Sequence, residues 1–290
     1  MLKGTSERVP GSYAEGMADV LAGRGCTWAF GAESLTITPE PGKAPKLLAA
    51  LGERVVPYAA IADVTLTPGR HRTVVLRVLP RQGADPVLTA AAGQLKPPAD
   101  PFRLVLPTAR ETLADYYADE LRAALTDRGP TEHFLIAAPP VPRAFKGWDG
   151  AASFDGTDVT FTWFWSGASA AKYSAGDQRY PVADLEGVEW HAPEGASGSL
   201  RLKPRGRRMS PDPNKDPASV VFSLGWGATH QSLPFAAAVL AAIPAPRRSL
   251  PVARGIQVAE LIAKLGELRD AGVLSEEEFQ AKKAELLSRL

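Results

Sequence analysis

Apolar and polar residues alternate in short runs along most of the chain. Residues 36–38 and 160–162 alternate threonine with apolar side chains, which is the period-2 pattern of a half-buried strand. Residues 73–79 form a longer run rich in valine and leucine that ends at Pro80. Turns with glycine or proline separate these runs at short intervals, so the pattern predicts antiparallel sheets rather than βαβ units.

The apolar period changes to that of a helix at two places. Residues 108–125 carry Leu113, Tyr117 and Leu121 at helical spacing, with charged residues between them. Residues 233–243 form an alanine-rich run that also fits a helix. Each run follows a strand-rich segment, so we expect each segment to end in one closing helix.

The two strand-rich segments are related by an internal repeat. An offset of 124 residues places Phe30 on Phe154 and Ile61 on Leu185. The same offset aligns Leu76-Arg77-Val78 with Leu200-Arg201-Leu202, and a later offset of 116 aligns Asp100-Pro101 with Asp216-Pro217. Such agreement over many positions indicates a duplication.

The repeated segments also resemble a known family. The stretch 56–64 of the first copy and 180–190 of the second, with Trp28-Ala29-Phe30-Gly31 and Ser153-Phe154-Asp155-Gly156, resemble a domain of unknown function that is repeated in tandem in actinobacterial proteins. The resemblance covers roughly residues 25–245. The family is placed among PH-like domains, so it implies a mainly β protein with two tandem PH-like barrels, each closed by a C-terminal helix. It implies no catalytic residues.

The C-terminal segment 255–290 carries local signals for a helical hairpin. Gly272 fits the end of a first helix whose apolar residues lie on one face. Ser275 and Glu278 form the capping box of a second helix, and Leu274 and Phe279 form its hydrophobic staple. The sequence therefore predicts two short helices in this segment.

This segment resembles the short C-terminal domain called SHOCT, through residues 265–279, Lys282-Lys283 and Leu286-Leu287. The resemblance implies oligomerisation or contact with a partner. A hairpin this small also needs another surface to cover its apolar faces. The residues expected to form that contact are Leu261, Leu265, Leu268, Phe279, Leu286 and Leu287. The contact is expected with another subunit, and packing on the chain's own PH-like domains is the alternative.

These patterns divide the chain into six segments. They are a polar N-terminal segment (1–24), a PH-like domain (25–125), a linker (126–147), a second PH-like domain (148–245), a second linker (246–254) and the SHOCT hairpin (255–290).

The composition is that of a soluble cytoplasmic protein. The 290 residues carry a formal net charge of +1, which gives no bulk signal for nucleic acid. The N-terminus lacks the apolar stretch of a secretory signal, and the apolar run 233–243 is too short to span a bilayer. The charge therefore predicts no nucleic-acid partner, and the lack of these apolar segments predicts a cytoplasmic protein.

Catalytic and cofactor motifs are not found in the sequence. The single cysteine, Cys26, has no local histidine partner, and we interpret it as a residue of a half-buried strand. The four histidines show no metal-ligand spacing: His71, His133, His191 and His230. The sequence thus predicts no enzyme, no cofactor and no metal.

Two segments are candidate binding surfaces. Residues 201–208 contain five cations at an expected strand exit, a pattern that suits an anionic ligand or simply a solvated loop: Arg201, Lys203, Arg205, Arg207 and Arg208. In the second segment, Phe161, Trp163 and Trp165 are expected on one strand face, with Phe164 opposite. Core packing is one interpretation, and an exposed aromatic edge that binds a peptide or another subunit is the other.

The sequence as a whole favours a non-catalytic cytoplasmic scaffold or adaptor. In this hypothesis the tandem PH-like domains bind an unidentified protein, and the SHOCT hairpin drives homo-oligomerisation. The alternative is a peripheral protein that binds an anionic membrane surface or a phosphate ligand through the basic loop of the second PH-like domain.

Overall fold

The computed structural model describes residues 19–194, 197–223, 225–244, 264–265, 269 and 275–287. The chain divides into two compact units, Met1–Ile243 and Pro244–Leu290. The first unit contains both repeats, and the second contains helix α7 (Glu276–Leu287). Among the helices that the structure describes, none has the length and apolar character needed to cross a membrane.

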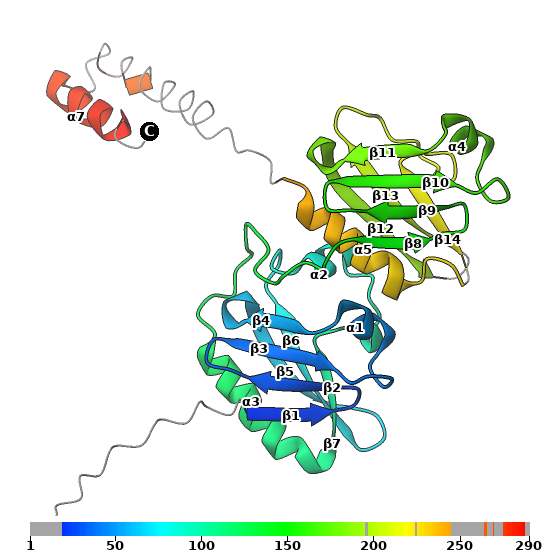
Figure 1. Cartoon of the computed structure of the whole chain (residues 1–290). Helices are drawn as coiled ribbons and strands as arrows, with labels where there is room; N and C mark the ends of the chain where they lie inside the picture. The colour runs from blue at the N-terminus through cyan, green and yellow to red at the C-terminus, as the bar shows by residue number, and fades with distance from the viewer. Residues whose placement is uncertain are drawn as a thin grey trace, which may run out of the picture. The chain divides into compact units, whose positions relative to one another are not determined.

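The first repeat consists of two antiparallel sheets followed by a closing helix (Figure 1). One sheet has the strand order β1-β2-β3-β4 and the other β5-β6-β7. Its elements are β1 (Asp19–Gly23), β2 (Cys26–Phe30), β3 (Ser34–Pro39), α1 (Lys46–Leu51), β4 (Arg54–Pro57), η1 (Tyr58–Ala60), β5 (Ile61–Pro68), β6 (Thr73–Pro80), α2 (Pro86–Ala91), η2 (Pro97–Ala99), β7 (Arg103–Pro107), η3 (Thr108–Arg110) and α3 (Glu111–Ala124).

The second repeat follows the same plan, with sheets in the orders β11-β10-β9-β8 and β12-β13-β14 and a closing helix, α5. No helix corresponding to α2 is present among its described residues. Its elements are β8 (Arg143–Lys146), β9 (Gly150–Phe154), β10 (Asp158–Trp163), α4 (Ala170–Ala175), β11 (Gln178–Pro181), η4 (Val182–Asp184), β12 (Leu185–Glu194), β13 (Ser197–Pro204), β14 (Ser219–Ser223) and α5 (Thr229–Ala242).

The predicted duplication is confirmed in detail. Ile61 and Leu185 are both fully buried, and each is the first residue of a corresponding strand, β5 or β12. Each of these strands also has a register irregularity directly after that residue. An Arg–Asp ion pair recurs as well. Arg77 lies 2.7 Å from Asp100, and at the matching positions Arg201 lies 3.7 Å from Asp216.

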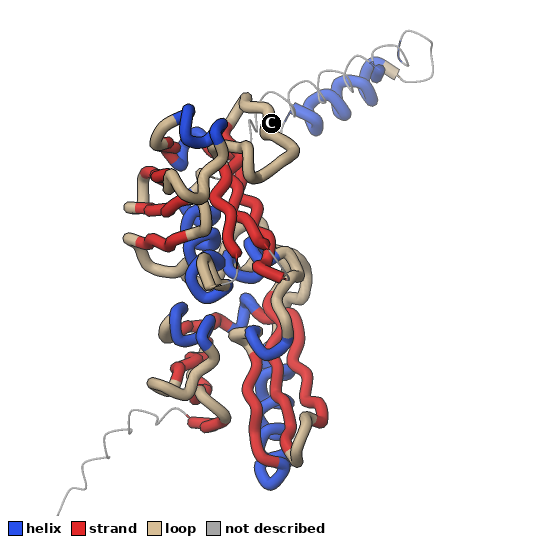
Figure 2. The backbone as a smooth tube through the Cα atoms, turned by 90° about the vertical axis from the view of Figure 1, so that its right-hand side faces the viewer, coloured by secondary structure: helices blue, strands red, loops and turns tan. Residues whose placement is uncertain are grey.

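The predicted mainly β fold is confirmed, but closed barrels are not observed. The described strands form four separate sheets, and Figure 2 shows the two sheets of each repeat as distinct layers. The chain turns through η1 or η4 between the sheets, which separates β4 from β5 and β11 from β12. The sheets approach each other where the Arg24 N–H donates to the Val105 carbonyl (2.8 Å) and the Trp148 N–H donates to the Val221 carbonyl (2.7 Å).

Each repeat has a hydrophobic core, and the core of the second repeat extends into the first repeat. The core of the second repeat includes five buried residues from α1 and α2 of the first: Leu47, Leu51, Val87, Ala90 and Ala91. Their neighbour Leu48 belongs to the core of the first repeat. Polar contacts strengthen this junction, because the side-chain amide of Gln94 donates to the Trp190 carbonyl and accepts from the Ala192 N–H, both at 2.9 Å. The repeats are therefore not independent bodies joined by a tether.

The closing helices α3 and α5 show which surface is buried in this junction. Both have 14 residues, and an offset of 118 aligns their buried positions. On α3 the outward positions include Asp115 and Glu120, which are exposed. The matching residues of α5, Leu233 and Ala238, are buried. Helix α3 buries only one face and is amphipathic. Helix α5 is also covered on its outer face by α1 and α2, and it is accordingly apolar on nearly all sides.

Three element boundaries differ from the sequence-based expectation. Strand β1 begins at Asp19, inside the segment 1–24 that was expected to be polar and separate. Strand β8 lies in the expected linker 126–147 and pairs with β9. Helix α5 begins at Thr229 rather than at residue 233. Edge strands of four or five residues carry too little alternation to be recognised from sequence alone.

The segment between α3 and β8 packs on the first repeat. Arg81 donates from Nε to the Gly129 carbonyl (2.6 Å) and forms an ion pair with Asp127 (2.5 Å). The Ile136 N–H donates to the Ala84 carbonyl (3.0 Å), and the Ile136 side chain is buried. This segment is therefore anchored at two places before the second repeat begins.

The packing of α5 against α1 and α2 predicts that substitutions at corresponding positions of α5 and α3 have unequal effects on the free energy of unfolding. Ala238→Glu places a carboxylate in the junction, and we expect it to lower the free energy of unfolding by several kcal/mol. Glu120→Ala, at the corresponding exposed position of α3, should change it by less than about 0.5 kcal/mol. Urea unfolding of the two variants measures the difference. Equal effects would contradict a junction that buries α5 and leaves α3 solvated.

Candidate functional site

The basic segment 201–208 lies at the end of β13 and in the loop that follows. Arg201 pairs with Asp216, and the Lys203 ammonium lies 2.6 Å from a Glu189 carboxylate oxygen. The Lys203 side chain also holds the pKa of Glu189 below its usual range, through a hydrogen bond and its charge. Two of the five candidate cations are therefore paired with carboxylates inside the protein.

The other three cations form an exposed loop, which we call the arginine loop: Arg205, Arg207 and Arg208. Arg207 donates to the Tyr180 hydroxyl (3.3 Å), so one arginine is tied to β11. Among the described residues, no carboxylate lies within ion-pair distance of any of these three side chains. Anion binding by this loop stays a prediction, now restricted to three residues.

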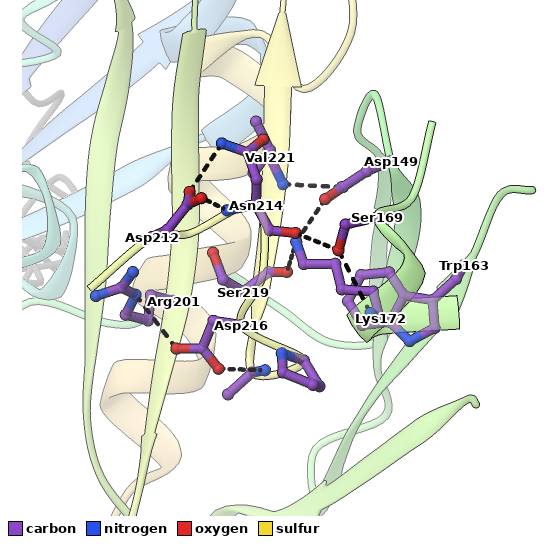
Figure 3. Close-up of polar contacts among 12 residues, drawn as sticks. Asp149, Trp163, Ser169, Lys172, Arg201, Asp212, Asn214, Asp216, Ser219 and Val221 are labelled. Atoms are coloured by element: carbon purple, nitrogen blue, oxygen red, sulfur yellow. Dashed lines mark hydrogen bonds and ion pairs between the residues drawn. The ribbon is translucent and has the colours of Figure 1, made fainter. Parts of the chain in front are cut away.

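The second repeat contains a buried ion pair between Lys172 and Asp149 (Figure 3). The Lys172 side chain is 0% exposed, and its Nζ lies 2.5 Å from Asp149 Oδ2 and 2.6 Å from the Ser219 carbonyl. The ammonium also faces the Trp163 ring, 4.9 Å from its centroid. Asp149 Oδ1 accepts from the Val221 N–H (2.9 Å), so this pair joins α4, the turn after β8 and strand β14.

Burial dominates the electrostatics of this pair. It raises the pKa of the Asp149 carboxyl and lowers the pKa of the Lys172 ammonium, because desolvation disfavours both charges. The attraction between the two groups acts in the opposite direction on each pKa. Neither side chain has the surface exposure needed to reach a ligand, so we assign the pair to the fold rather than to chemistry.

The first repeat shows that this ion pair is not required by the fold. At the positions matching Lys172 and Asp149, it has Leu48, which is buried in its core, and Gly25. Neither Lys172 nor Asp149 belongs to a motif that the sequence displays. The offset of 124 contained the signal, since it aligns a lysine with a core leucine.

The aromatic run of β10 divides between core and surface. Phe161 is fully buried, and Trp163 is half-buried with its Nε1–H donating to the Gly176 carbonyl (2.8 Å). The strand ends at Trp163, so Trp165 does not share its face as predicted. Trp165 is instead 85% exposed in the loop before α4.

Two surface hollows meet at Trp226, which is 47% exposed. The first has a volume of about 500 Å³ and lies where α1 and η2 of the first repeat approach the start of α5. The second, of about 550 Å³, lies against β8, β9 and Thr162 of β10. The Gly225-Trp226 segment lines both hollows. The sequence did not predict this site, because a single tryptophan between two glycines carries no pattern that indicates a binding surface.

The described part of the chain does not support a cysteine nucleophile or a metal site. Cys26 is buried in β2, and burial raises the pKa of its thiol to about 11. Such a thiol is almost entirely protonated at neutral pH and is a poor nucleophile. No cluster of three His, Cys, Asp or Glu side chains suited to a metal ion is found among the described residues.

In the C-terminal unit, the predicted capping box of the second helix is confirmed. The Ser275 N–H donates to Glu278 Oε2 (3.0 Å), and the Glu278 N–H donates to Ser275 Oγ (3.2 Å). Phe279 is 7% exposed and is flanked by Arg269 and Lys283, whose charged groups lie 4.8 and 5.9 Å from the ring centroid.

The other predicted docking residues are described less fully. Leu265 is half-buried. Leu261 and Leu268 lie outside the described residues, and so do Gly272 and Leu274 of the predicted helix end and staple. Leu286 and Leu287 belong to α7.

These features define a class of protein: a tandem-repeat β protein with a separate helical module at its C-terminus. The family profile of the Domain of unknown function (DUF4429) matches residues 28–122 and 152–240, and that of the Short C-terminal domain (SHOCT) matches residues 260–287. The chain belongs to the DUF4429 family and carries a C-terminal SHOCT domain. Neither family is a known catalytic family. A search of the curated proteins found no match.

The buried ion pair predicts that the free energy of unfolding falls when one of its two charges is removed and the other is kept. Asp149→Asn keeps an acceptor for the Val221 N–H but leaves the Lys172 ammonium buried without a carboxylate. We expect this variant to lose about 3–5 kcal/mol of stability. Adding Lys172→Met should restore most of the loss, because an apolar side chain occupies this place in the first repeat. Chemical unfolding of the single and double variants measures this recovery, and a double variant as unstable as Asp149→Asn would refute the assignment.

Proposed function

We propose that this protein is a non-catalytic accessory protein in which two PH-like repeats bind a protein partner and the SHOCT module drives self-association. The observation that carries the proposal is the packing of α1 and α2 of the first repeat into the core of the second. It makes one body from two duplicated domains and leaves binding surfaces at its ends and at the junction. Two ion pairs among the described residues, Lys172 with Asp149 and Arg54 with Asp85, are buried on both sides, and their charges serve the fold, which supports a scaffold role.

The family membership supports the second part of the proposal. A SHOCT domain follows the repeats and forms a compact unit of its own. Its second helix begins at a local capping box, whose two hydrogen bonds involve no residue of the repeats. Two or more copies of a weak binding body joined in this way would gain affinity by avidity.

Self-association through the C-terminal unit can be tested by light scattering. We expect the full chain to be a homo-oligomer at micromolar concentration and a chain that ends at Leu250 to be a monomer. Leu265→Glu or Phe279→Glu should dissociate the oligomer, because a carboxylate in an apolar contact is desolvated without a partner. Lys264→Glu, an exposed position of the same unit, serves as the control. A monomeric full chain would contradict self-association and would show that the apolar faces of the hairpin are covered within a single chain.

A second candidate function is the binding of an anionic membrane surface at the arginine-loop end. The observation that favours it is the exposure of three arginines, none of which forms an ion pair among the described residues, on the repeat that also exposes Trp165 and Tyr173, which is 64% exposed. Arginines attract anionic lipid headgroups, and partly apolar aromatic rings suit the membrane interface.

This second function predicts binding to vesicles that contain phosphatidylglycerol, and no binding to phosphatidylcholine vesicles. Combined Arg205→Glu, Arg207→Glu and Arg208→Glu substitutions should abolish sedimentation with these vesicles at low salt, where screening is weakest. Arg70→Glu with Arg72→Glu, in the exposed β5–β6 hairpin, is the matched control. Failure of the wild-type protein to sediment with the anionic vesicles at low salt would exclude this function.

A further inference from the structure

The two hollows beside Trp226 are built by a segment that differs between the repeats. The offset between matching residues is 116 at β7 and β14 but 118 at α3 and α5, so the second repeat gains two residues between strand and helix. The inserted stretch contains Gly225 and Gly227 on either side of Trp226, and both glycines have positive φ angles (91° and 63°). A Cβ at Gly227 would lie 2.7 Å from Phe222 side-chain atoms, so only glycine fits there. The backbone is thus shaped to present the indole ring.

In the first repeat, the place that corresponds to the second hollow is occupied by a side chain of the repeat itself. There Arg110 donates from Nη1 to the Ala22 carbonyl of edge strand β1 (3.2 Å). In the second repeat, Ala228 matches Arg110 and Lys146 matches Ala22. The arginine that covers the edge strand is therefore replaced by a methyl group, and the second hollow lies against β8 at this place.

The charges around the hollows have one sign. The positive charges among the described lining are Lys46 in the first hollow and Lys146 in the second. Burial and the charge of Lys46 lower the pKa of His230 in the first hollow, so this histidine is mainly neutral at pH 7 and can donate a hydrogen bond. No aspartate or glutamate belongs to the described lining of either hollow. The rest of the lining is mainly proline, alanine, glycine and small hydroxyl residues, which leaves room for side chains of a ligand. The two hollows thus complement a ligand with apolar side chains and negative charge.

We propose that the hollows on either side of Trp226 form a groove for an extended, acidic peptide segment of a partner protein. The peptide packs across the Trp226 ring, with one carboxylate near Lys46 and His230 and another near Lys146. An extended chain advances about 3.3 Å per residue and places side chains i and i+2 on the same face, so side chains of that face can enter the two hollows while the chain crosses the indole. This inference rests on the proposed partner-binding function and names the surface and the chemistry of the partner.

The experiment is selection from a displayed library of random dodecapeptides on the full-length protein. Enriched peptides should carry two or more Asp or Glu residues. Labelled synthetic copies should bind Trp226→Ala roughly tenfold more weakly than wild type by fluorescence anisotropy, as for loss of a central aromatic contact. Lys46→Glu and Lys146→Glu should each weaken binding by about three- to tenfold.

Matched controls separate the groove from other exposed residues. Trp165→Ala removes a more exposed tryptophan, and Lys215→Glu reverses an exposed lysine outside the groove, so both should leave peptide affinity within about twofold. Thermal melts of all variants show whether a loss of binding reflects unfolding.

The remaining outcomes distinguish the groove from the wider function. Enriched peptides that are neutral or basic, or that bind Trp226→Ala as tightly as wild type, overturn the groove and leave partner binding in place at another surface. A library with no enriched sequence also overturns the groove, and it leaves the binding of a folded partner, which the proposed function allows, in place. Self-association is measured independently by light scattering and does not depend on either result.

Discussion

The structure of the repeat unit depends on the burial of helix α5 from two sides. Its inner face closes the sheets of the second repeat, as α3 does in the first. Its outer face is covered by α1 and α2 of the first repeat, so that Leu233 and Ala238 are as buried as the inner residues. Burial of such side chains stabilises by about 25 cal/mol for each Å² of apolar surface, and here the gain is available only when both repeats are folded. Folding of the second repeat is therefore coupled to that of the first.

The same interaction explains why a duplicated sequence yields an asymmetric pair. Both repeats keep the two sheets, the closing helix and the Arg–Asp ion pair between neighbouring strands. They differ where one repeat meets the other. The outer face of α3 carries Asp115 and Glu120, and these charges prevent it from accepting the α1–α2 face of another copy in the way that α5 does. Open-ended stacking of repeats through the outer face of α3 is thereby disfavoured.

The candidate binding features occur where the repeats differ in length. Between β13 and β14 the second repeat is eight residues shorter than its counterpart, lacks a helix matching α2 among its described residues, and carries the arginine loop instead. Between β14 and α5 it is two residues longer and presents Trp226. Loops tolerate such changes because the sheets and the closing helix hold their ends in place. A common frame thus supports different surfaces at its two ends.

The sequence by itself determined the duplication, the order of strands and closing helices, and the cap of α7. These features depend on residues a few positions apart or on a constant offset, and the capping box of Ser275 and Glu278 is an example. Tertiary structure alone decided that Lys172 meets Asp149, that Leu47 and Ala90 of one repeat join the core of the other, and that Trp226 stands between two hollows. Separations of 23 residues and more lie between those partners, and no local pattern records them. Local propensity and periodicity fix an element and its buried face, but which surface covers that face is fixed only when the whole chain packs.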